Sequence, residues 1–206
     1  MTFNPLREFI EKYYETIADL LSKGFNVTTL DWRGQGLSDR LLEDRNKGHI
    51  KDFSQYVSDL DQIVQQIILP QNTHPLFILG HSMGGHIALR YMHDHPKVID
   101  QAVLTAPMID IELGPMATVA RFIVSTMVRL GRGSAYAVSQ GAYSVESRAQ
   151  EATLLSSDPE RLKVEVEQCR KHPELALGGV TYGWLKAAFR SVSLLRTMGY
   201  PQAIKT

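Results

Sequence analysis

Short apolar runs alternate along the chain with longer segments in which apolar residues recur every three or four positions. Runs of four to eight apolar residues are typical of buried strands, and the wider spacing is typical of amphipathic helices. The pattern predicts strands at residues 25–30, 76–79 and 99–106 and helices at residues 6–21, 53–69 and 87–95. This alternation indicates an α/β fold, in which a parallel sheet is covered by helices on both faces.

After Pro107 the pattern changes, because residues 108–196 contain no strand-like run. Helical spacing predicts helices at residues 116–130, 146–155, 159–171 and 182–195. We therefore divide the chain into an α/β core (1–107), a helical insert (108–196) and the start of a return to the core (197–206).

The junction between the second predicted strand and its helix carries a chemical motif. Gly80, Ser82 and Gly84 fit the pattern G-x-S-x-G, in which a strained turn presents a nucleophilic serine hydroxyl at the end of a strand. His81 and Gly85 complete this elbow. The helix that follows favours negative charge near its first turn, so the backbone N–H of Met83 is the expected donor to an oxyanion.

The bare motif is moderate evidence, since it arises by chance in about one chain in fifteen of this length. A strand before it and a helix after it are the context that a nucleophile elbow requires. The alternative is a glycine-rich turn whose serine only caps the helix. That alternative does not explain the glycines on both sides of Ser82.

The sequence GHSMGG, together with DWRGQGLS at residues 31–38, resembles the serine α/β-hydrolases of the lysophospholipase and monoacylglycerol lipase group, which include serine aminopeptidase-like hydrolases. The resemblance extends from about Phe9 onward. It implies a partial α/β-hydrolase fold whose helical insert is a cap or lid over Ser82. It also implies that Asp31 and Arg33 fix a loop near the active site. Most methionines of the insert are expected to pack in the interior, whereas a subset, Met108, Met116 and Met127, is the alternative set that faces an acyl chain, because flexible thioethers adapt to apolar ligands.

A serine nucleophile needs a base, usually a histidine that is held by a carboxylate. In the resembled family these two residues follow the cap, yet no histidine follows His172. Asp158 and His172 have the right order but lie in polar, helix-like sequence of the insert. The remaining histidines are expected on surface connections (His49, His74), in the elbow (His81) or on the helix behind it (His86, His93, His95). We therefore expect a truncated hydrolase, without its triad acid and histidine and with little activity alone.

The front of the chain is also short for the resembled family, which has three strands before the first helix seen here. Residues 1–8 are too few to form them. If the third strand is missing, the strands at 25–30 and 76–79 face a gap of about 9–10 Å. We expect either an altered sheet or unpaired backbone groups at this place.

Composition narrows the functional class. Apolar residues make up 44% of the 206, and 22 basic residues balance 22 acidic ones, so no nucleic-acid surface is indicated. The one cysteine, Cys169, is expected on a helix and indicates a reducing, cytoplasmic environment. No apolar run approaches the length of a membrane span. No residue pattern calls for a metal or another cofactor.

These observations predict a serine hydrolase that forms an acyl-enzyme with carboxylic esters, with lysophospholipids or monoacylglycerols as small-molecule substrates. A transient contact of the cap with a membrane surface is a further expectation. Peptidases, thioesterases and acyltransferases use the same elbow and remain alternatives. A second alternative is a non-catalytic module that binds a lipid or docks a partner through an exposed strand edge.

Overall fold

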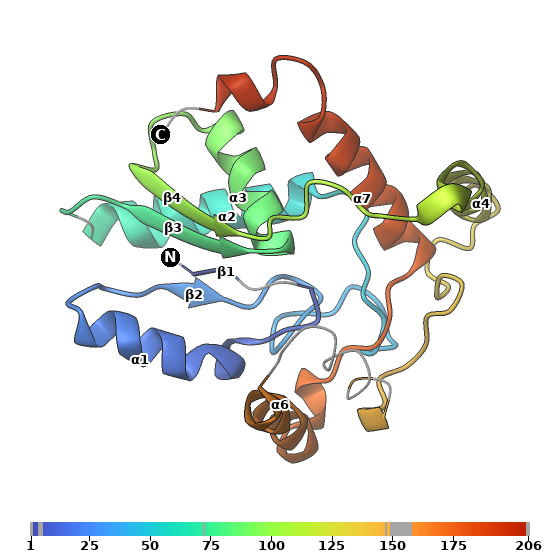
Figure 1. The fold of residues 1–206 in the computed structure, drawn as a ribbon, viewed down its shortest axis with the longest axis horizontal. Coiled ribbons are helices and arrows are strands. Elements are labelled where there is room, and N and C mark those ends of the chain that lie inside the picture. Colours follow the sequence, from blue (N-terminus) through green and yellow to red (C-terminus); the bar gives the residue numbers. More distant parts are fainter. Residues whose placement is uncertain (1, 4–5, 72, 147, 149–157, 205–206) are drawn as a thin grey trace.

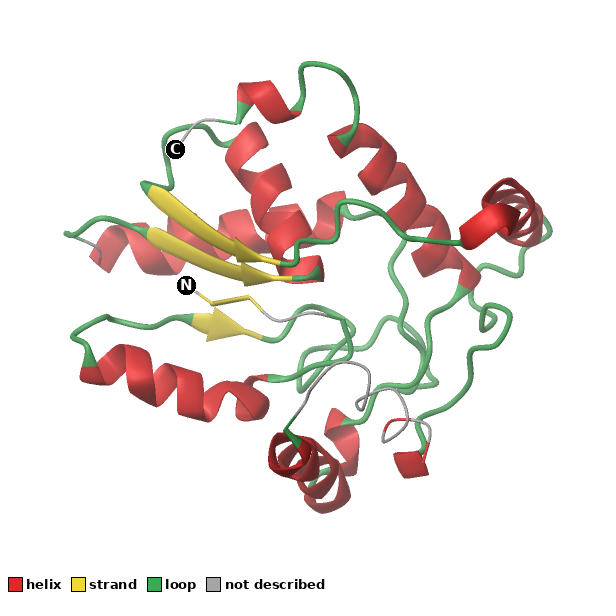
Figure 2. Cartoon of the chain, in the orientation of Figure 1, coloured by secondary structure: helices red, strands yellow, loops and turns green. Residues whose placement is uncertain are grey.

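A parallel sheet lies at the centre of the fold (Figures 1 and 2). The computed structural model describes residues 2–3, 6–71, 73–146, 148 and 158–204. Within these residues the strands have the order β2-β1-β3-β4, and all pairs are parallel. The strands are β1 (Thr2–Phe3), β2 (Thr29–Leu30), β3 (Phe77–His81) and β4 (Gln101–Thr105). The α-helices are α1 (Tyr14–Ser22), α2 (Ser54–Ile63), α3 (Met83–Asp94), α4 (Ala117–Arg129), α6 (Pro159–Lys171) and α7 (Tyr182–Leu195).

The expected gap in the sheet is filled, which corrects the prediction for the front of the chain. Thr2 pairs with both Thr29 of β2 and Leu79 of β3, so β1 lies between these two strands. The pairing covers Thr29–Leu30 on one side and Leu79–Gly80 on the other. The backbone groups of these four residues therefore have partners in β1.

Two other boundaries differ from the prediction. The first helix is a 3₁₀ turn at Ile10–Tyr13 that continues as α1, and only Thr29–Leu30 of the expected strand at 25–30 pairs in the sheet. The second helix does not end before Pro70, because a π turn at Val64–Ile68 and a 3₁₀ turn at Leu69–Gln71 extend it. A 3₁₀ turn tolerates proline near its start, where the missing N–H has no helical acceptor. Further 3₁₀ turns occupy Gly114–Met116, Pro173–Leu175 and Pro201–Ala203.

The two faces of the sheet are covered to different extents. Residues of β3 and β4 alternate, and Ile78 and Leu104 face the main hydrophobic core beneath α3. Phe77 and Val103 point to the other face and are 38% and 61% exposed. In Figure 1, α1 lies beside β2, away from α2 and α3. Coverage of both faces, which the sequence pattern predicts, is therefore incomplete in the described residues.

The main core joins α2, α3 and α7. Phe53, Ile87 and Trp184 are buried in the same cluster, and the Phe53 and Trp184 rings pack edge to face at 5.5 Å. Thr181 caps α7 by accepting from the N–H of Trp184 (3.2 Å). At α2, Asp52 lies one residue before the N-cap Phe53 and accepts from the N–H of Ser54 (2.9 Å). Thus α7, which lies in the predicted insert, packs as part of the core.

The rest of the insert has its own contacts. A smaller cluster around Val124 and Phe189 joins α4 to α7, and α6 packs Cys169 against Phe9. Cys169 lies on a helix, as predicted, and it is buried. Next to it, a buried ionic cluster joins α6 to the first helix, since Glu165 pairs with Lys12 (3.0 Å) and with Arg148. Most of the helix predicted at 146–155 lies outside the described residues.

None of the helices that the structure describes is long and apolar enough to cross a membrane.

Candidate active site

Ser82 sits at the sharp junction between β3 and α3. Its backbone has φ 49° and ψ −116°, a conformation that residues with a side chain rarely adopt. Three backbone hydrogen bonds hold this strained turn: the Ser82 N–H donates to the Thr105 carbonyl (3.1 Å), and the Ser82 carbonyl accepts from the N–H groups of His86 and Met108 (3.0 Å each). The strand, turn and helix that the sequence predicts are therefore present, and the serine carries their strain.

Two glycines of the motif are required by close packing. A Cβ atom on Gly80 would lie 2.9 Å from Cα of Gly85, and one on Gly85 would lie 3.0 Å from Cβ of Pro107. The first distance is too short for a methyl group against backbone, and the second is a tight contact with a rigid proline ring. The glycines thus let the start of α3 pack directly against the end of β3.

Met83 begins α3, so its N–H has no acceptor within the helix. Its side chain is fully buried, and the sulfur lies 3.9 Å from the amide nitrogen of Gln35. Gln35 is itself buried, and its Oε1 accepts from the N–H of Arg7 (2.7 Å) in the segment after β1. Through Gln35, the RGQG loop therefore contacts both the first residue of α3 and the segment after β1. The sequence pattern gave no sign of this role for Gln35.

Asp31 and Arg33 act on loop geometry, as the sequence analysis expects. The Asp31 carboxylate accepts from the N–H groups of Ile10 (3.0 Å) and Leu37 (2.9 Å). The Arg33 guanidinium is paired with Asp59 on α2 (2.6 Å). Burial raises the pKa of Asp31, although these backbone hydrogen bonds oppose the rise.

Each histidine of the chain has a neighbour other than Ser82. The pairs are His49 with Thr181, His74 with Thr73, His81 with Thr105, His86 with Met108 and Ser191, His93 with Asp94, His95 with Asp61, and His172 with Glu174. Among the described residues no imidazole is hydrogen-bonded to the Ser82 hydroxyl. Asp158 and His172 are both exposed on the insert. His49 is half-buried, so the expectation of a surface residue is wrong.

The methionines expected along an acyl chain do not gather at one place. Met108 packs on the main core, Met127 packs on the cluster between α4 and α7, and Met116 is exposed. Within the described part of the chain, no group of three or more metal-binding side chains is positioned to hold a metal ion.

Comparisons with known proteins agree with this geometry. Residues 3–198 match the family described as serine aminopeptidase, S33. The chain belongs to the serine aminopeptidase S33 family. It is 35% identical to lysophospholipase L2 of Escherichia coli (strain K12) over 176 residues, which are 85% of this chain and 51% of that protein. It is 31% identical over 193 residues to a probable lysophospholipase L2 of Haemophilus influenzae, covering 93% of this chain and 60% of that protein.

Solved structures show the α/β-hydrolase fold for this S33-family chain. The monoacylglycerol lipase of Paleococcus ferrophilus superposes with a TM-score of 0.65 at 22% identity, over 93% of this chain and 65% of that one. A carboxyl esterase from Bacillus coagulans gives a TM-score of 0.70 at 16% identity, over 98% and 66% of the two chains. The chain spans about half the length of its first curated relative, at 51%.

Behind the elbow of this S33-family chain, a buried polar chain connects α3, α7 and the loop after β4. Because a carbonyl only accepts, Nδ1–H of His86 donates to the Met108 carbonyl (2.7 Å), and Nε2 then accepts from the Ser191 hydroxyl (2.6 Å). Met108 in turn donates its N–H to the carbonyl of Ser82. His86 is therefore a positioning residue, which sequence spacing did not reveal because its partner lies 105 positions away.

His86 predicts a specific pH dependence of stability. Burial, reinforced by the charge of Arg90, lowers its pKa from 6.5 to about 4. The unfolded chain takes up the proton first, so stability is full above pH 6.5 and is lost as the pH falls towards 4. We expect about 2 kcal/mol of this contribution to disappear between pH 7 and pH 5. Urea unfolding at both pH values measures it.

The matched variants are His86→Gln, whose amide can both donate and accept, and His74→Gln, which changes an exposed histidine on the turn before β3. The loss of stability from pH 7 to pH 5 should shrink by about 2 kcal/mol in His86→Gln and stay unchanged in His74→Gln. Equal pH dependence in the two variants would show that His86 is not the buried neutral group.

Proposed function

We propose that this chain provides the nucleophile of a carboxylic ester hydrolase. Ser82 Oγ bonds to the carbonyl carbon while its proton passes to a base, and the Met83 N–H donates to the oxyanion. The alcohol then leaves with a proton, and water cleaves the acyl-enzyme to release the acid and restore the serine. The observation that carries this proposal is the strained backbone of Ser82, at φ 49°, held between a buried strand and a helix.

The second part of the proposal concerns the general base that would take the proton of Ser82. Every histidine is engaged elsewhere, so Ser82 as described has no activating imidazole. We propose that the isolated chain reacts slowly and that full activity needs an imidazole and a carboxylate beside Ser82. General bases contribute about 10²- to 10⁴-fold to such reactions, which sets the size of the deficit.

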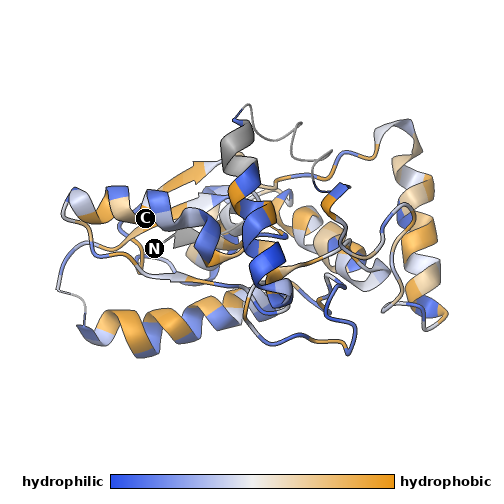
Figure 3. Cartoon of the chain, turned by 90° about the horizontal axis from the view of Figure 1, so that it is seen from below, coloured by the Kyte–Doolittle hydropathy of each residue, from blue (hydrophilic) through white to orange (hydrophobic). Residues whose placement is uncertain are grey.

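For the substrate we propose a lipid ester, either a lysophospholipid or a monoacylglycerol. The names of the relatives, lysophospholipase L2 and monoacylglycerol lipase, support this class. The surface of the insert also supports it. Large apolar side chains are exposed along and just beyond α4, the helix at the far right of Figure 3: Met116, Val119, Phe122, Ile123 and Leu130.

The charge around α4 fits a transient contact with an anionic lipid surface. Residues 113–145 contain no acidic residue and three arginines: Arg129, Arg132 and Arg121, which is paired with Asp110 (3.7 Å) just before this segment. A helix with exposed apolar residues beside cationic ones partitions into the interface of a membrane. We propose that α4 is the part of the insert that makes this contact.

Phe122, which is 70% exposed, is the residue to test. Replacing it by serine should weaken binding to phosphatidylglycerol vesicles about tenfold, because a phenyl ring is lost from the interface. Co-sedimentation measures this binding. The matched control is Phe25→Ser, an exposed phenylalanine outside α4, which should bind as the wild type does. Equal binding by both variants would contradict a contact through α4.

Substrate profiling tests the reaction itself. Lysophosphatidylcholine, monoacylglycerol, an acyl thioester and an aminoacyl anilide are compared, with the dependence on Ser82 checked for each. Faster turnover of the first two supports the proposed class, whereas preference for the anilide or the thioester would replace it with a peptidase or a thioesterase. Lipid binding without turnover, unchanged in Ser82→Ala, would favour a non-catalytic module.

We also propose a cytoplasmic location. Its support is the single cysteine, Cys169, which has no partner for an internal disulfide in this sequence. Fractionation of cells that produce the protein tests it.

A further inference from the structure

A cavity of about 410 Å³ lies among the start of α2, the middle of α3 and the end of α7. Two arginines line it, Arg90 of α3 and Arg190 of α7, together with hydroxyl groups of Ser54, Ser193 and Thr197. The chemistry of this lining differs from that of the elbow, since it offers positive charge and hydrogen-bond donors. Arg90 also lies about 12 Å from Ser82 along the axis of α3, at 1.5 Å per residue.

Arg90 is the unusual member of this lining. Its side chain is buried, at 8% exposed, and Nη1 donates to the Ser191 hydroxyl (3.0 Å). Its Nε is buried without an acceptor. Among the described residues no carboxylate lies within 4.0 Å of its guanidinium. The guanidinium contacts the neutral hydroxyls of Ser191 and Tyr200. Because a buried charge without a nearby counter-ion is costly, an anion at this place would lower the free energy of the folded state.

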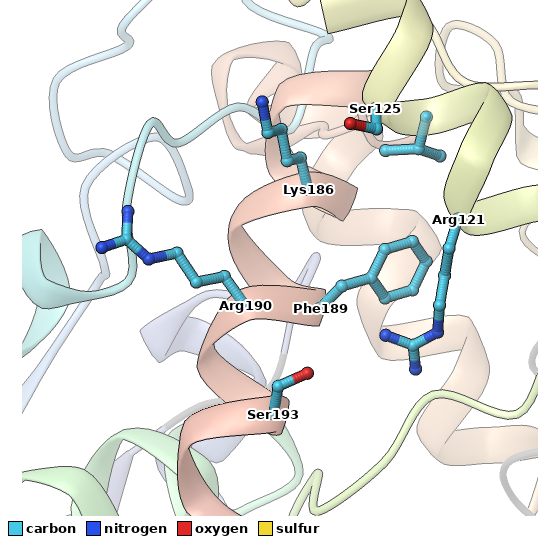
Figure 4. A pocket seen from close by; sticks show the side chains of 7 residues that line it. Arg121, Ser125, Lys186, Phe189, Arg190 and Ser193 are labelled. Carbon is cyan, nitrogen blue, oxygen red and sulfur yellow. The ribbon is translucent and has the colours of Figure 1, made fainter.

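Arg190 adds a second guanidinium that is accessible from solvent. Its side chain is 81% exposed and is paired with Asp52 (3.2 Å). Figure 4 shows Arg190 extending from α7 on the side away from Arg121 and Phe189. Asp52 balances one of the two positive charges in the cavity, so a charge of about +1 remains.

The pKa of Asp52 is lowered by its hydrogen bonds and by the positive charges around it. Burial would raise its pKa, but hydrogen bonds from Ser54 and the charges of Arg190 and Arg90 lower it below its usual value. Its carboxylate also accepts from the N–H of Ser54 at the start of α2. The lining of the cavity therefore already stabilises the negative charge of Asp52. This carboxylate is half-buried and forms one part of the lining.

We propose that this cavity binds a tetrahedral oxyanion, a phosphate group, between Arg90 and Arg190. A guanidinium donates two parallel hydrogen bonds to such an anion, and the Ser193 hydroxyl in the lining supplies a further donor. The phosphate is either free in solution or part of a phosphodiester headgroup. The site is separate from the elbow and does not depend on the proposed esterase activity.

Isothermal titration of the 206-residue chain with inorganic phosphate, at constant ionic strength against chloride, tests the site. Arg190→Ala should weaken phosphate binding at least tenfold, because it removes one guanidinium without disturbing the core. The matched control is Lys186→Ala, which removes an exposed cation one turn away on α7 that does not line this cavity. It should change the affinity by less than twofold.

A second variant and a second ligand complete the test. Arg90→Lys keeps the charge but loses the planar fork, so it should also weaken binding, with folding checked by circular dichroism. Tighter binding of glycerophosphocholine than of phosphate assigns the site to a headgroup, and the reverse order assigns it to free phosphate. Absence of binding above chloride, or equal affinity of Arg190→Ala and Lys186→Ala, would refute the proposal.

Discussion

Fluorophosphonate labelling of the chain is expected to be slow, to occur on Ser82 alone, and to disappear in Ser82→Ala. The strained turn presents one serine hydroxyl at the end of β3, next to the N–H groups that begin α3. Labelling should be slow because no described imidazole is hydrogen-bonded to that hydroxyl. We expect a rate about 10²- to 10⁴-fold below that of a serine with a positioned base. Mass spectrometry of labelled peptides identifies the site, and the time course provides the rate.

Ser125→Ala on α4 is the matched control, since it removes a serine hydroxyl far along the sequence from the elbow. It should label like the wild type. Fast labelling of the wild type would mean that a base reaches Ser82. Labelling that persists in Ser82→Ala would show that Ser82 is not the nucleophile.

Replacing Trp184 by alanine is expected to destabilise the protein by about 3–5 kcal/mol. The indole is 3% exposed and packs against Phe53 at the start of α2, in the same cluster as Ile87 of α3. Its loss leaves a cavity between three helices that cannot close easily. Urea unfolding at pH 7 measures the change, with a two-state transition as the condition for comparing the variants.

The control is Phe122→Ala, an aromatic residue of α4 that is 70% exposed and should cost at most about 0.5 kcal/mol. A small effect of Trp184→Ala, similar to that of the control, would show that α7 separates from the core as a lid does. The expected large effect would show that α7 is part of the core. It would then support a boundary of the helical insert before α7 in place of the predicted boundary at residue 196. We propose that the cap ends near Thr181, where the side chain of this residue caps α7.

Local patterns allowed much of the fold to be predicted. The helices at 116–130, 159–171 and 182–195 correspond to α4, α6 and α7, and the elbow has the predicted order of strand, turn and helix. These features depend on interactions between residues close in sequence, such as helical spacing and caps. The place of Gly80 in the motif is predictable for the same reason, because Gly80, Ser82 and Gly85 belong to one turn.

Long-range pairing was predicted less well. The strand at 25–30 is reduced to Thr29–Leu30, because its length depends on what β1 offers as a partner. Nothing in the pattern of residues 1–8 indicated that Thr2–Phe3 would enter the sheet between two later strands. His49 was assigned to the surface, yet its ring is hydrogen-bonded to Thr181, far away in the sequence.

By itself, the sequence determined where a strained serine lies, because a strand, two packed glycines and a helix follow each other within a few residues. It also determined the class of fold, since alternating periodicities of two kinds require a layered parallel sheet. Only the tertiary structure decided which groups surround that serine, that α7 packs in the main hydrophobic cluster, and that Arg90 is buried beside Ser191 with no carboxylate of the described residues within 4.0 Å. The physical reason is that burial and charge pairing depend on residues about a hundred positions apart, whose meeting no local pattern encodes.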